Sequence, residues 1–315
     1  MSDLKRLVFV LSFIVMVNSF VLGDICKPFP DGDLNRDFSV GIKDVKLIAD
    51  NWLQTVSDPD INSPDIDLSG MVNFKDFSVV AENTGQKGSF AINRVIPDDA
   101  GIVVVTEPPY NADNTGVTDV TSILSNAASN NKVVYLPNGV YRVTDTVMID
   151  FINYWEDRMF IGQSTEGTII KLDDNCSGYS SGSKGVIRTV PAGQDTFRRY
   201  VRNLTIDTGV GNPAAVGLEF QCSNNGAAYD LHIISRDGQG RVGLKTQVSG
   251  NSGPMLVKNI VVEGFDTGIE ASAFHSQTLE NIFLFNQNNY GIYSSGRVLS
   301  MRGIYSDNTC KAIYK

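Results

Sequence analysis

Asn259-Ile260-Val261-Val262-Glu263 is one of five short β-rich segments that begin with Asn, Asp or Gly and continue with an aliphatic residue. The other four are residues 203–207, 230–233, 281–285 and 303–306, and the leading residues lie 27, 29, 22 and 22 positions apart. Self-similarity at this interval is typical of a solenoid, in which each repeat forms one turn of a continuing coil.

A second short apolar segment follows each of these five, as in Gly217-Leu218-Glu219-Phe220. It recurs at residues 243–245, 268–270, 291–293 and 312–314. Each unit therefore holds at least two short strands. It is too short for a propeller blade and lacks the leucine spacing of a leucine-rich repeat. We predict an all-β fold: a right-handed parallel β-helix with aliphatic residues stacked inside and rungs about 4.8 Å apart.

The segment before the repeats predicts a helix over residues 119–130, which would cover the open edge of the first rung, and then a strand, a turn and a strand over residues 133–143. The motifs at residues 113–119, 133–141 and 160–163 resemble the entry segment of the pectate lyase superfamily, the rhamnogalacturonase/epimerase-like β-helices. The resemblance covers residues 105–315. Members usually carry a second Asp where Val120 stands, which predicts a weaker helix cap here.

Two copies of a calcium-loop pattern, residues 33–44 and 65–76, precede this region. Oxygen-bearing side chains fall at loop positions 1, 3, 5 and 12, and position 7 offers a backbone carbonyl, which suits Ca²⁺. Gly70 stands at the sharp turn of the second copy, where the first has Phe38. The predicted ligands are Asp33, Asn35, Asp37, Ser39 and Asp44, then Asp65, Asp67, Ser69, Met71, Asn73 and Asp76.

A helix is predicted after each loop. Its apolar stripe is Val45, Ile48, Ala49 and Trp52 in the first copy and Phe77, Val80, Ala81 and Thr84 in the second, which Gly85 ends. This duplicated loop and helix, residues 31–86, resembles a small α-helical, calcium-binding dockerin. The resemblance implies a cohesin-like partner, although Ile42-Lys43 and Phe74-Lys75 replace the usual hydroxyl pair. The alternative is a calcium-stapled spacer without a partner.

The domain plan is a signal peptide at 1–23, the dockerin-like domain at 24–86, a linker at 87–100 and the β-helix at 101–315. Lys5 and Arg6 before the apolar run 7–17 predict export, so the protein is expected to be secreted or extracellular, either free or associated with the cell surface. The repeat stops in mid-pattern at Lys315, which predicts truncation at the C-terminus.

Charge and cysteine content narrow the partners. The net charge is −9, and residues 24–86 hold twelve acidic against five basic residues. Without a basic stripe, a nucleic-acid partner is not expected, and neither is a membrane after signal cleavage. The four cysteines permit disulfides, and we expect Cys222 and Cys310 to be buried free thiols.

Strand alternation selects the candidate catalytic residues by turning side chains outward. In the second apolar segment of each repeat, one outward position is predicted to form a column of Glu219, Lys245, Glu270 and Tyr293. A glycosidase needs two nearby carboxylates, whereas a lyase needs a base or cation beside an acidic sugar. The predicted catalytic set is Asp207, Glu263, Asp266, Glu270 and Lys245.

Each of these candidates has a structural alternative. Lys245 and Glu270 are more often an exposed cross-strand salt bridge. His232 and His275 are expected at the surface. Phe283, Phe285 and Tyr305 are expected to face outward, where they would stack on sugar rings or be covered by a loop.

The resemblance thus implies a secreted carbohydrate-active protein. It would degrade a pectin-like or other acidic polysaccharide by lyase or glycoside hydrolase chemistry. The alternative is a non-catalytic β-helix for glycan binding or adhesion.

Overall fold

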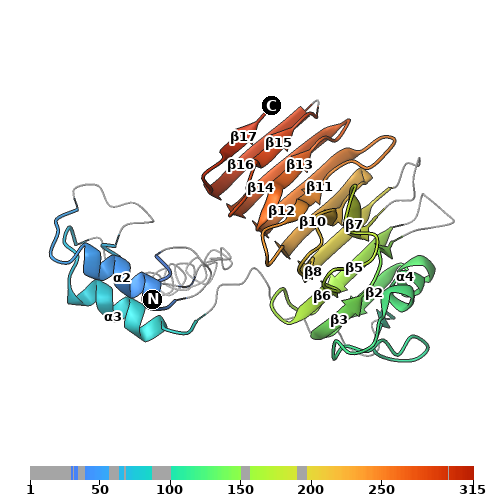
Figure 1. Ribbon diagram of the computed structural model, residues 1–315, viewed down its shortest axis with the longest axis horizontal. Helices are drawn as coiled ribbons and strands as arrows, with labels where there is room; N and C mark the ends of the chain where they lie inside the picture. Colours follow the sequence, from blue (N-terminus) through green and yellow to red (C-terminus); the bar gives the residue numbers. More distant parts are fainter. Residues whose placement is uncertain are drawn as a thin grey trace, which may run out of the picture. The chain divides into compact units, whose positions relative to one another are not determined.

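The computed structural model describes residues 30, 32–34, 40–56, 64–66, 69–86, 101–149, 157–189, 197–296 and 298–315. The chain divides into two compact units, Met1–Phe90 and Ala91–Lys315, which are treated separately below (Figure 1). The predicted signal peptide and linker lie outside the described residues, as do Asn35, Asp37, Ser39 and Asp67. The predicted domain boundaries therefore stay predictions.

The first unit contains two helices, α2 (Ile42–Asp50) and α3 (Phe74–Asn83). Each begins two residues before loop position 12, earlier than predicted, because the carboxylates of Asp44 and Asp76 cap the helix starts. Gly85 follows α3 with φ +87°, as a C′ glycine should.

A small core of Val40, Ile48, Val72 and Val80 joins the two halves of the first unit. Val40 and Val72 occupy loop position 8, so each of the duplicated loops contributes one residue to the shared core. The predicted apolar stripes are wrong in part, because Ala49, Phe77 and Ala81 are exposed. Such short helices bury one narrow line of residues rather than a broad face.

The described residues of the second unit form parallel strands and the helix α4 (Thr121–Asn130). Within its described residues, the strands form a ten-stranded and a seven-stranded sheet. The ten-stranded sheet contains β1 (Val103–Val104), β2 (Val133–Leu136), β3 (Gly139–Val143), β5 (Arg158–Gly162), β6 (Thr168–Leu172), β8 (Arg199–Asp207), β10 (Ser223–Ile234), β12 (Gly253–Glu263), β14 (Ser276–Phe285) and β16 (Val298–Asp307). The seven-stranded sheet contains β4 (Val147–Met148), β7 (Lys184–Arg188), β9 (Ala215–Glu219), β11 (Gly240–Lys245), β13 (Phe265–Ala271), β15 (Tyr290–Ser294) and β17 (Lys311–Tyr314).

The chain passes from one sheet to the other and back with every turn, so β8, β10, β12, β14 and β16 stack in one sheet while β9, β11, β13, β15 and β17 stack in the other (Figure 1). This alternation is that of a parallel β-helix. Its right-handedness stays a prediction from the general rule for parallel crossovers.

Aliphatic columns fill the interior. Leu204, Leu231, Ile260 and Ile282 occupy the same position on successive rungs, and all four are fully buried. Leu218, Leu244, Ile269 and Ile292 form the matching column of the second sheet. Because burying one such side chain contributes about 1.5–3 kcal/mol, these columns are the main source of stability.

Helix α4 covers the first rung as predicted. It packs against β2 and β4, and its buried Leu124, Ala127 and Ala128 belong to the same apolar cluster as the coil interior. Val120 is its N-cap residue and makes no side-chain cap hydrogen bond. The Asp119 carboxylate instead accepts from the Thr121 N–H at 3.0 Å.

The leading residues of the five repeats form a bend column: Asn203, Asp230, Asn259, Asn281 and Gly303. All have φ between +51° and +64°, a region in which Asn, Asp and Gly are tolerated best. The side chains also bond to one another: Asn259 Nδ2 donates to Asp230 Oδ1 at 2.8 Å, and Asn281 Nδ2 donates to Asn259 Oδ1 at 3.1 Å. This pairing explains why the repeat is marked by these residue types.

Replacing Asn259 tests this bend. Asn259→Val loses two hydrogen bonds and forces a β-branched residue to positive φ, so the free energy of unfolding should fall by about 2–4 kcal/mol. Asn259→Gly loses the same bonds but keeps the backbone conformation, and should cost about half as much. Chemical denaturation of both variants measures the difference, and equal losses would contradict the conformational part.

Candidate functional site

A line of charged side chains crosses the outer face of the seven-stranded sheet. Arg188, Glu219, Lys245 and Glu270 occupy one register position on β7, β9, β11 and β13, and we call them the charge column. Rungs of a parallel sheet lie about 4.8 Å apart, so alternating basic and acidic groups follow one another at that interval. The predicted outward column is therefore present.

Two ion pairs organise the charge column. Arg188 Nε lies 3.4 Å from Glu219 Oε2, and Lys245 Nζ lies 3.3 Å from Glu270 Oε1. The Lys245 and Glu270 side chains are 23% and 25% exposed, so both can meet a ligand, whereas that of Glu219 is 5% exposed. Lys245 and Glu270 are the two predicted catalytic residues that the fold brings into contact.

Glu219 is the residue that the catalytic prediction missed. Desolvation by burial raises its pKa above the ordinary value of 4.5, although Arg188, Lys245 and the Gly185 N–H oppose the shift. Gly185 makes room for this carboxyl, since a Cβ there would lie 2.9 Å from Glu219 Oε2. Sequence alternation placed Glu219 in the column but gave no sign of its burial.

Tyrosines continue the line beyond Glu270. Tyr293 and Tyr314 follow in the same register position, and Tyr290 lies beside them. The ring centroids of Tyr290 and Tyr314 are 4.8 Å apart with 22° between planes, and those of Tyr293 and Tyr314 are 5.9 Å apart with 17°. Partly exposed aromatic rings beside charged groups are a common surface for sugars.

Asp207 is predicted to lie at the outer edge of its coil. This prediction is wrong, because the Asp207 side chain is fully buried. Its carboxylate accepts from Arg236 Nε at 2.7 Å and from the Gly209 N–H at 2.9 Å. Strand alternation ends at the turn that follows β8, and the chain there folds over this carboxylate. Asp207 thus holds the turn and the half-exposed Arg236.

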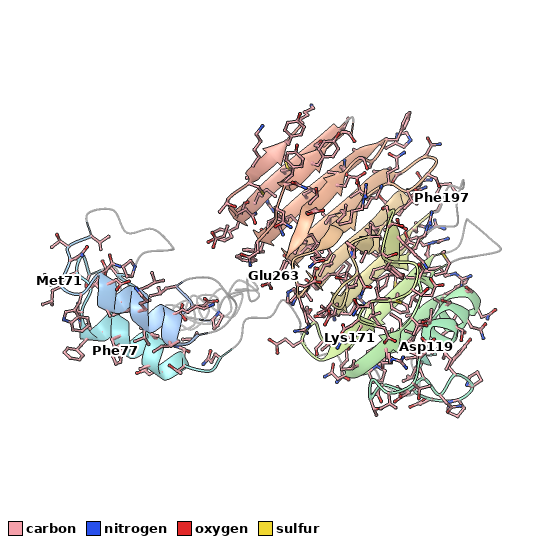
Figure 2. All side chains as sticks on the ribbon, viewed as in Figure 1. Met71, Phe77, Asp119, Lys171, Phe197 and Glu263 are labelled. Atoms are coloured by element: carbon pink, nitrogen blue, oxygen red, sulfur yellow. The ribbon has the colours of Figure 1, made fainter. Side chains whose placement is uncertain are left out.

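Glu263 and Asp266 lie apart from the charge column. Glu263 ends β12 in the other sheet, where its Oε2 is 3.7 Å from His232 Nε2. In the view of Figure 2, Glu263 lies at the left of this unit and Phe197 at its right. Asp266 is the second residue of β13, and its carboxylate accepts from Asn288 Nδ2 at 3.1 Å. Neither residue meets a second predicted catalytic group.

The remaining predicted surface residues divide. His275 is exposed and His232 is half-buried. Phe283 and Tyr305 are half-buried, and Phe285 is 8% exposed, so of its two expected states Phe285 is covered rather than open to a sugar ring. Its ring packs 5.7 Å from that of Tyr305.

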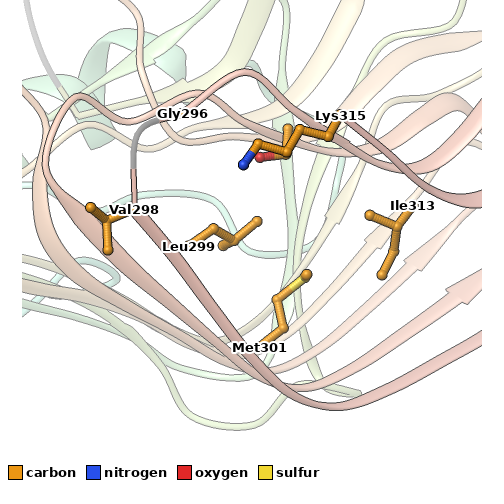
Figure 3. Close-up of a pocket in the computed structure, with 7 residues that line it drawn as sticks. Gly296, Val298, Leu299, Met301, Ile313 and Lys315 are labelled. Atoms are coloured by element: carbon orange, nitrogen blue, oxygen red, sulfur yellow. The ribbon is translucent and has the colours of Figure 1, made fainter.

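The thiols and the end pocket offer no catalytic chemistry. Cys176 and Cys222 are buried free thiols and Cys310 is a partly buried one. Burial raises the pKa of Cys222 to about 12, which makes it inert. A pocket of about 310 Å³ at the last rung is lined by Leu299, Met301 and Ile313 and carries no carboxylate side chain (Figure 3).

The loops of the first unit repeat one hydrogen-bond pattern. Asp44 accepts from the N–H groups of Leu34 and Gly41, each at 2.8 Å. Asp76 accepts from the residues at the same offsets, Ile66 at 2.6 Å and Asn73 at 2.8 Å. These two position-12 carboxylates are fully buried.

The position-1 carboxylates of the loops are buried as well: Asp33 is 7% exposed and Asp65 is fully buried. Asp65 accepts from the N–H groups of Ser69 and Gly70. Each carboxylate oxygen that accepts one such bond keeps a lone pair that a hard cation can use. Within the described ranges, no group of three or more His, Cys, Asp or Glu side chains is arranged to hold a metal, and loop positions 3 and 5 lie largely outside those ranges.

Several solved structures resemble the chain. Among them are Geobacillus virus E2 ORF18 (14% identity, TM-score 0.40), the catalytic unit of a thermostable GH87 alpha-1,3-glucanase from Streptomyces thermodiastaticus strain HF3-3 (17%, 0.45) and the A-module of the Azotobacter vinelandii mannuronan C-5 epimerase AlgE6 (19%, 0.42). The matches cover 66%, 73% and 67% of this chain but 60%, 44% and 58% of those chains. At these TM-scores the likeness carries no functional inference.

No curated protein matches the chain. Within the described residues, none of the helices has the length and apolarity needed to cross a membrane. A family model described as "Rhamnogalacturonase A/epimerase, pectate lyase-like" matches residues 104–314. This match confirms the resemblance predicted for residues 105–315. The chain belongs to the rhamnogalacturonase A/epimerase, pectate lyase-like family.

Proposed function

We propose that the second unit cleaves a polysaccharide on the outer face of its seven-stranded sheet, at the charge column. The family description names enzymes that act on carbohydrates, in agreement with a polysaccharide lyase or glycoside hydrolase. The observation that carries the proposal is the in-register line of Arg188, Glu219, Lys245 and Glu270. Such a line presents its groups at intervals close to the repeat of a sugar chain laid along it.

Hydrolysis is the chemistry that the two carboxyl groups favour. Glu219 and Glu270 are two rungs apart, about 9–10 Å between backbones, near the spacing of inverting glycosidases. Glu219, whose pKa is raised, would be the acid: in this proposal the bound substrate uncovers its 5% exposed side chain, which gives its proton to a glycosidic oxygen lying over the column. Glu270 would act as the base that activates water.

Lys245 lies between these carboxyl groups and supports an acidic substrate, because its ammonium can pair with a uronate carboxylate. The same position supports β-elimination as a second candidate reaction, in which Lys245 would be the base that takes the proton beside that carboxylate. The non-catalytic alternative draws support from the tyrosines beyond Glu270, which offer binding without cleavage.

Product analysis separates these reactions. The full chain is incubated with polygalacturonate and with rhamnogalacturonan. New reducing ends without unsaturation are expected, and Glu270→Gln should lower kcat about 10²–10⁴-fold. Glu263→Gln, a carboxylate in the other sheet, should leave kcat unchanged. Unsaturated ends would show that the reaction is elimination and not hydrolysis. Binding without any product would show that the protein binds glycans without cleaving them.

The pH dependence of stability tests the buried Glu219. Its pKa is higher in the folded than in the unfolded chain, so its contribution is complete below the unfolded value and is lost as pH rises through the folded value. Glu219→Gln should therefore gain stability relative to the parent as pH rises above about 4.5. Urea denaturation across pH measures this.

Glu280→Gln is the matched control for Glu219→Gln, with the opposite sign. Hydrogen bonds from Lys258 and Arg302 lower the Glu280 pKa, so its contribution is lost as pH falls. A flat stability difference for Glu219→Gln would contradict the raised pKa.

For the first unit we propose two Ca²⁺ sites in a dockerin-like module. The supporting observation is the pair of loops whose buried carboxylates repeat one geometry, with Asp33 and Asp44 in one loop and Asp65 and Asp76 in the other. Ca²⁺ would neutralise these buried charges and fix the loops.

Docking to a cohesin-like partner is proposed on the exposed Ile42 and Phe74, which are 81% and 75% exposed and begin α2 and α3 at matching loop positions. We also propose that the protein is exported, because the N-terminal residues Lys5 and Arg6 and the apolar run 7–17 have the pattern of a signal peptide.

Chelation tests the calcium proposal. Removing Ca²⁺ should lower the melting temperature of the first unit by about 10–20 °C, since saturating ligand contributes about 2–4 kcal/mol. The fluorescence of Trp52, whose ring lies 5.0 Å from that of Phe74, reports the transition. Asp65→Asn should shrink the chelator-induced shift, whereas Asp50→Asn, an exposed α2 residue paired with Lys46, should not. An unchanged melt under chelator would overturn the calcium sites.

A further inference from the structure

A second surface, on the ten-stranded sheet, has the features of a small-ligand pocket. Its floor is formed by Ala227, Leu256 and Thr278, which occupy one register position on β10, β12 and β14. The pocket has a volume of about 320 Å³, within the usual range of about 300–1,000 Å³ for ligand sites. It therefore has room for a sugar ring.

The lining of this pocket combines apolar and hydrogen-bonding groups. Leu256 and Pro254 supply apolar surface, and Thr278 and Ser276 supply hydroxyls. Asn225 adds an exposed amide, which φ of +80° holds at the pocket rim. A sugar ring needs this combination, because it has an apolar face and a rim of hydroxyl groups.

A charged column borders the pocket two residues along the same strands. Arg202, Tyr229, Lys258, Glu280 and Arg302 occupy one register position from β8 to β16. Residues two apart on a strand share a face and lie about 6–7 Å apart, so this column faces the same side as the pocket floor. It lies on a different sheet from the charge column of the proposed active site.

The bordering column is basic. Glu280 accepts from Lys258 Nζ and pairs with Arg302 Nη2, both at 2.8 Å, and it is one anion against three cations. The Lys258 and Arg302 side chains are 38% and 78% exposed, so both keep donors open to a ligand. Arg202 lies over the Tyr229 ring, 5.4 Å from its centroid. An anionic group in the pocket would find positive charge within reach.

We propose that this pocket is a second, non-catalytic binding site for an acidic saccharide. The sugar ring sits on Leu256 and Ala227, the hydroxyls of Thr278 and Ser276 contact its rim, and its carboxylate pairs with Lys258. The site holds the polymer on the opposite sheet from the charge column. It needs no cleavage reaction and stands whether or not the charge column is catalytic.

The test is calorimetric titration of the full chain with trigalacturonate. A Lys245→Gln background removes the ammonium that would bind the same ligand at the charge column. Lys258→Gln should weaken binding about tenfold through loss of one charge-assisted contact. Leu256→Trp should abolish it by filling the pocket. Lys171→Gln, which removes a charge elsewhere on the ten-stranded sheet, should leave the affinity unchanged.

Circular dichroism checks whether Leu256→Trp folds. If that variant does not fold, the affinity of the surface variant Lys258→Gln alone tests the site. Full affinity in Lys258→Gln, or in a folded Leu256→Trp, would overturn the site. Equal affinity for the neutral galactotriose would overturn the assignment of an acidic ligand. Trigalacturonate binding that both pocket variants reduce, with Lys171→Gln unaffected, supports the proposal.

Discussion

In-register stacking of identical positions is the constraint on which the second unit depends. Each coil must place its aliphatic residue directly over that of the coil before it, as Leu231, Ile260 and Ile282 do. The bend column enforces this alignment, because Asn259 and Asn281 take the same backbone conformation and bond to their neighbours on adjacent rungs. Apolar stacking supplies the stability, and the polar bends fix the register.

The same alignment shapes the outer surface. Side chains at one outward position become a straight line, so the outer surface carries linear arrays of side chains. The charge column and its tyrosines form one such array, and the column from Arg202 to Arg302 forms another. A linear polymer is the ligand shape that such arrays fit, which links the architecture to the carbohydrate-active family.

Much of this architecture is readable from sequence because it is periodic. The five bend residues, the helix before the first rung and the Lys245–Glu270 contact all follow from local spacing. One prediction that failed concerns a residue at the end of a periodic strand. Asp207 is the last residue of its strand, and the turn that buries it has its own geometry.

Burial was the second quantity that sequence could not supply. Glu219 and Lys245 share one register position, yet the Glu219 side chain is far less exposed, because its carboxyl lies over Gly185 and beside Arg188 of the preceding strand. Phe285 shows the same limit, since its burial comes from packing against Tyr305 rather than from alternation. The predicted Ca²⁺ ligands at loop positions 3 and 5 lie mostly outside the described residues, so they rest on the sequence pattern.

The unequal repeat intervals have a consequence for how such a protein can diversify. Intervals of 27 and 29 residues become 22 while the bend residues stay in register, although β10 and β12 shift register near Ser223, so most of the extra residues are absorbed by turns such as residues 246–252. Turn length is thus uncoupled from the frame. Evolution or an engineer can lengthen, shorten or graft these turns as walls beside the linear arrays, and so alter which glycan fits while the frame beneath is inherited intact.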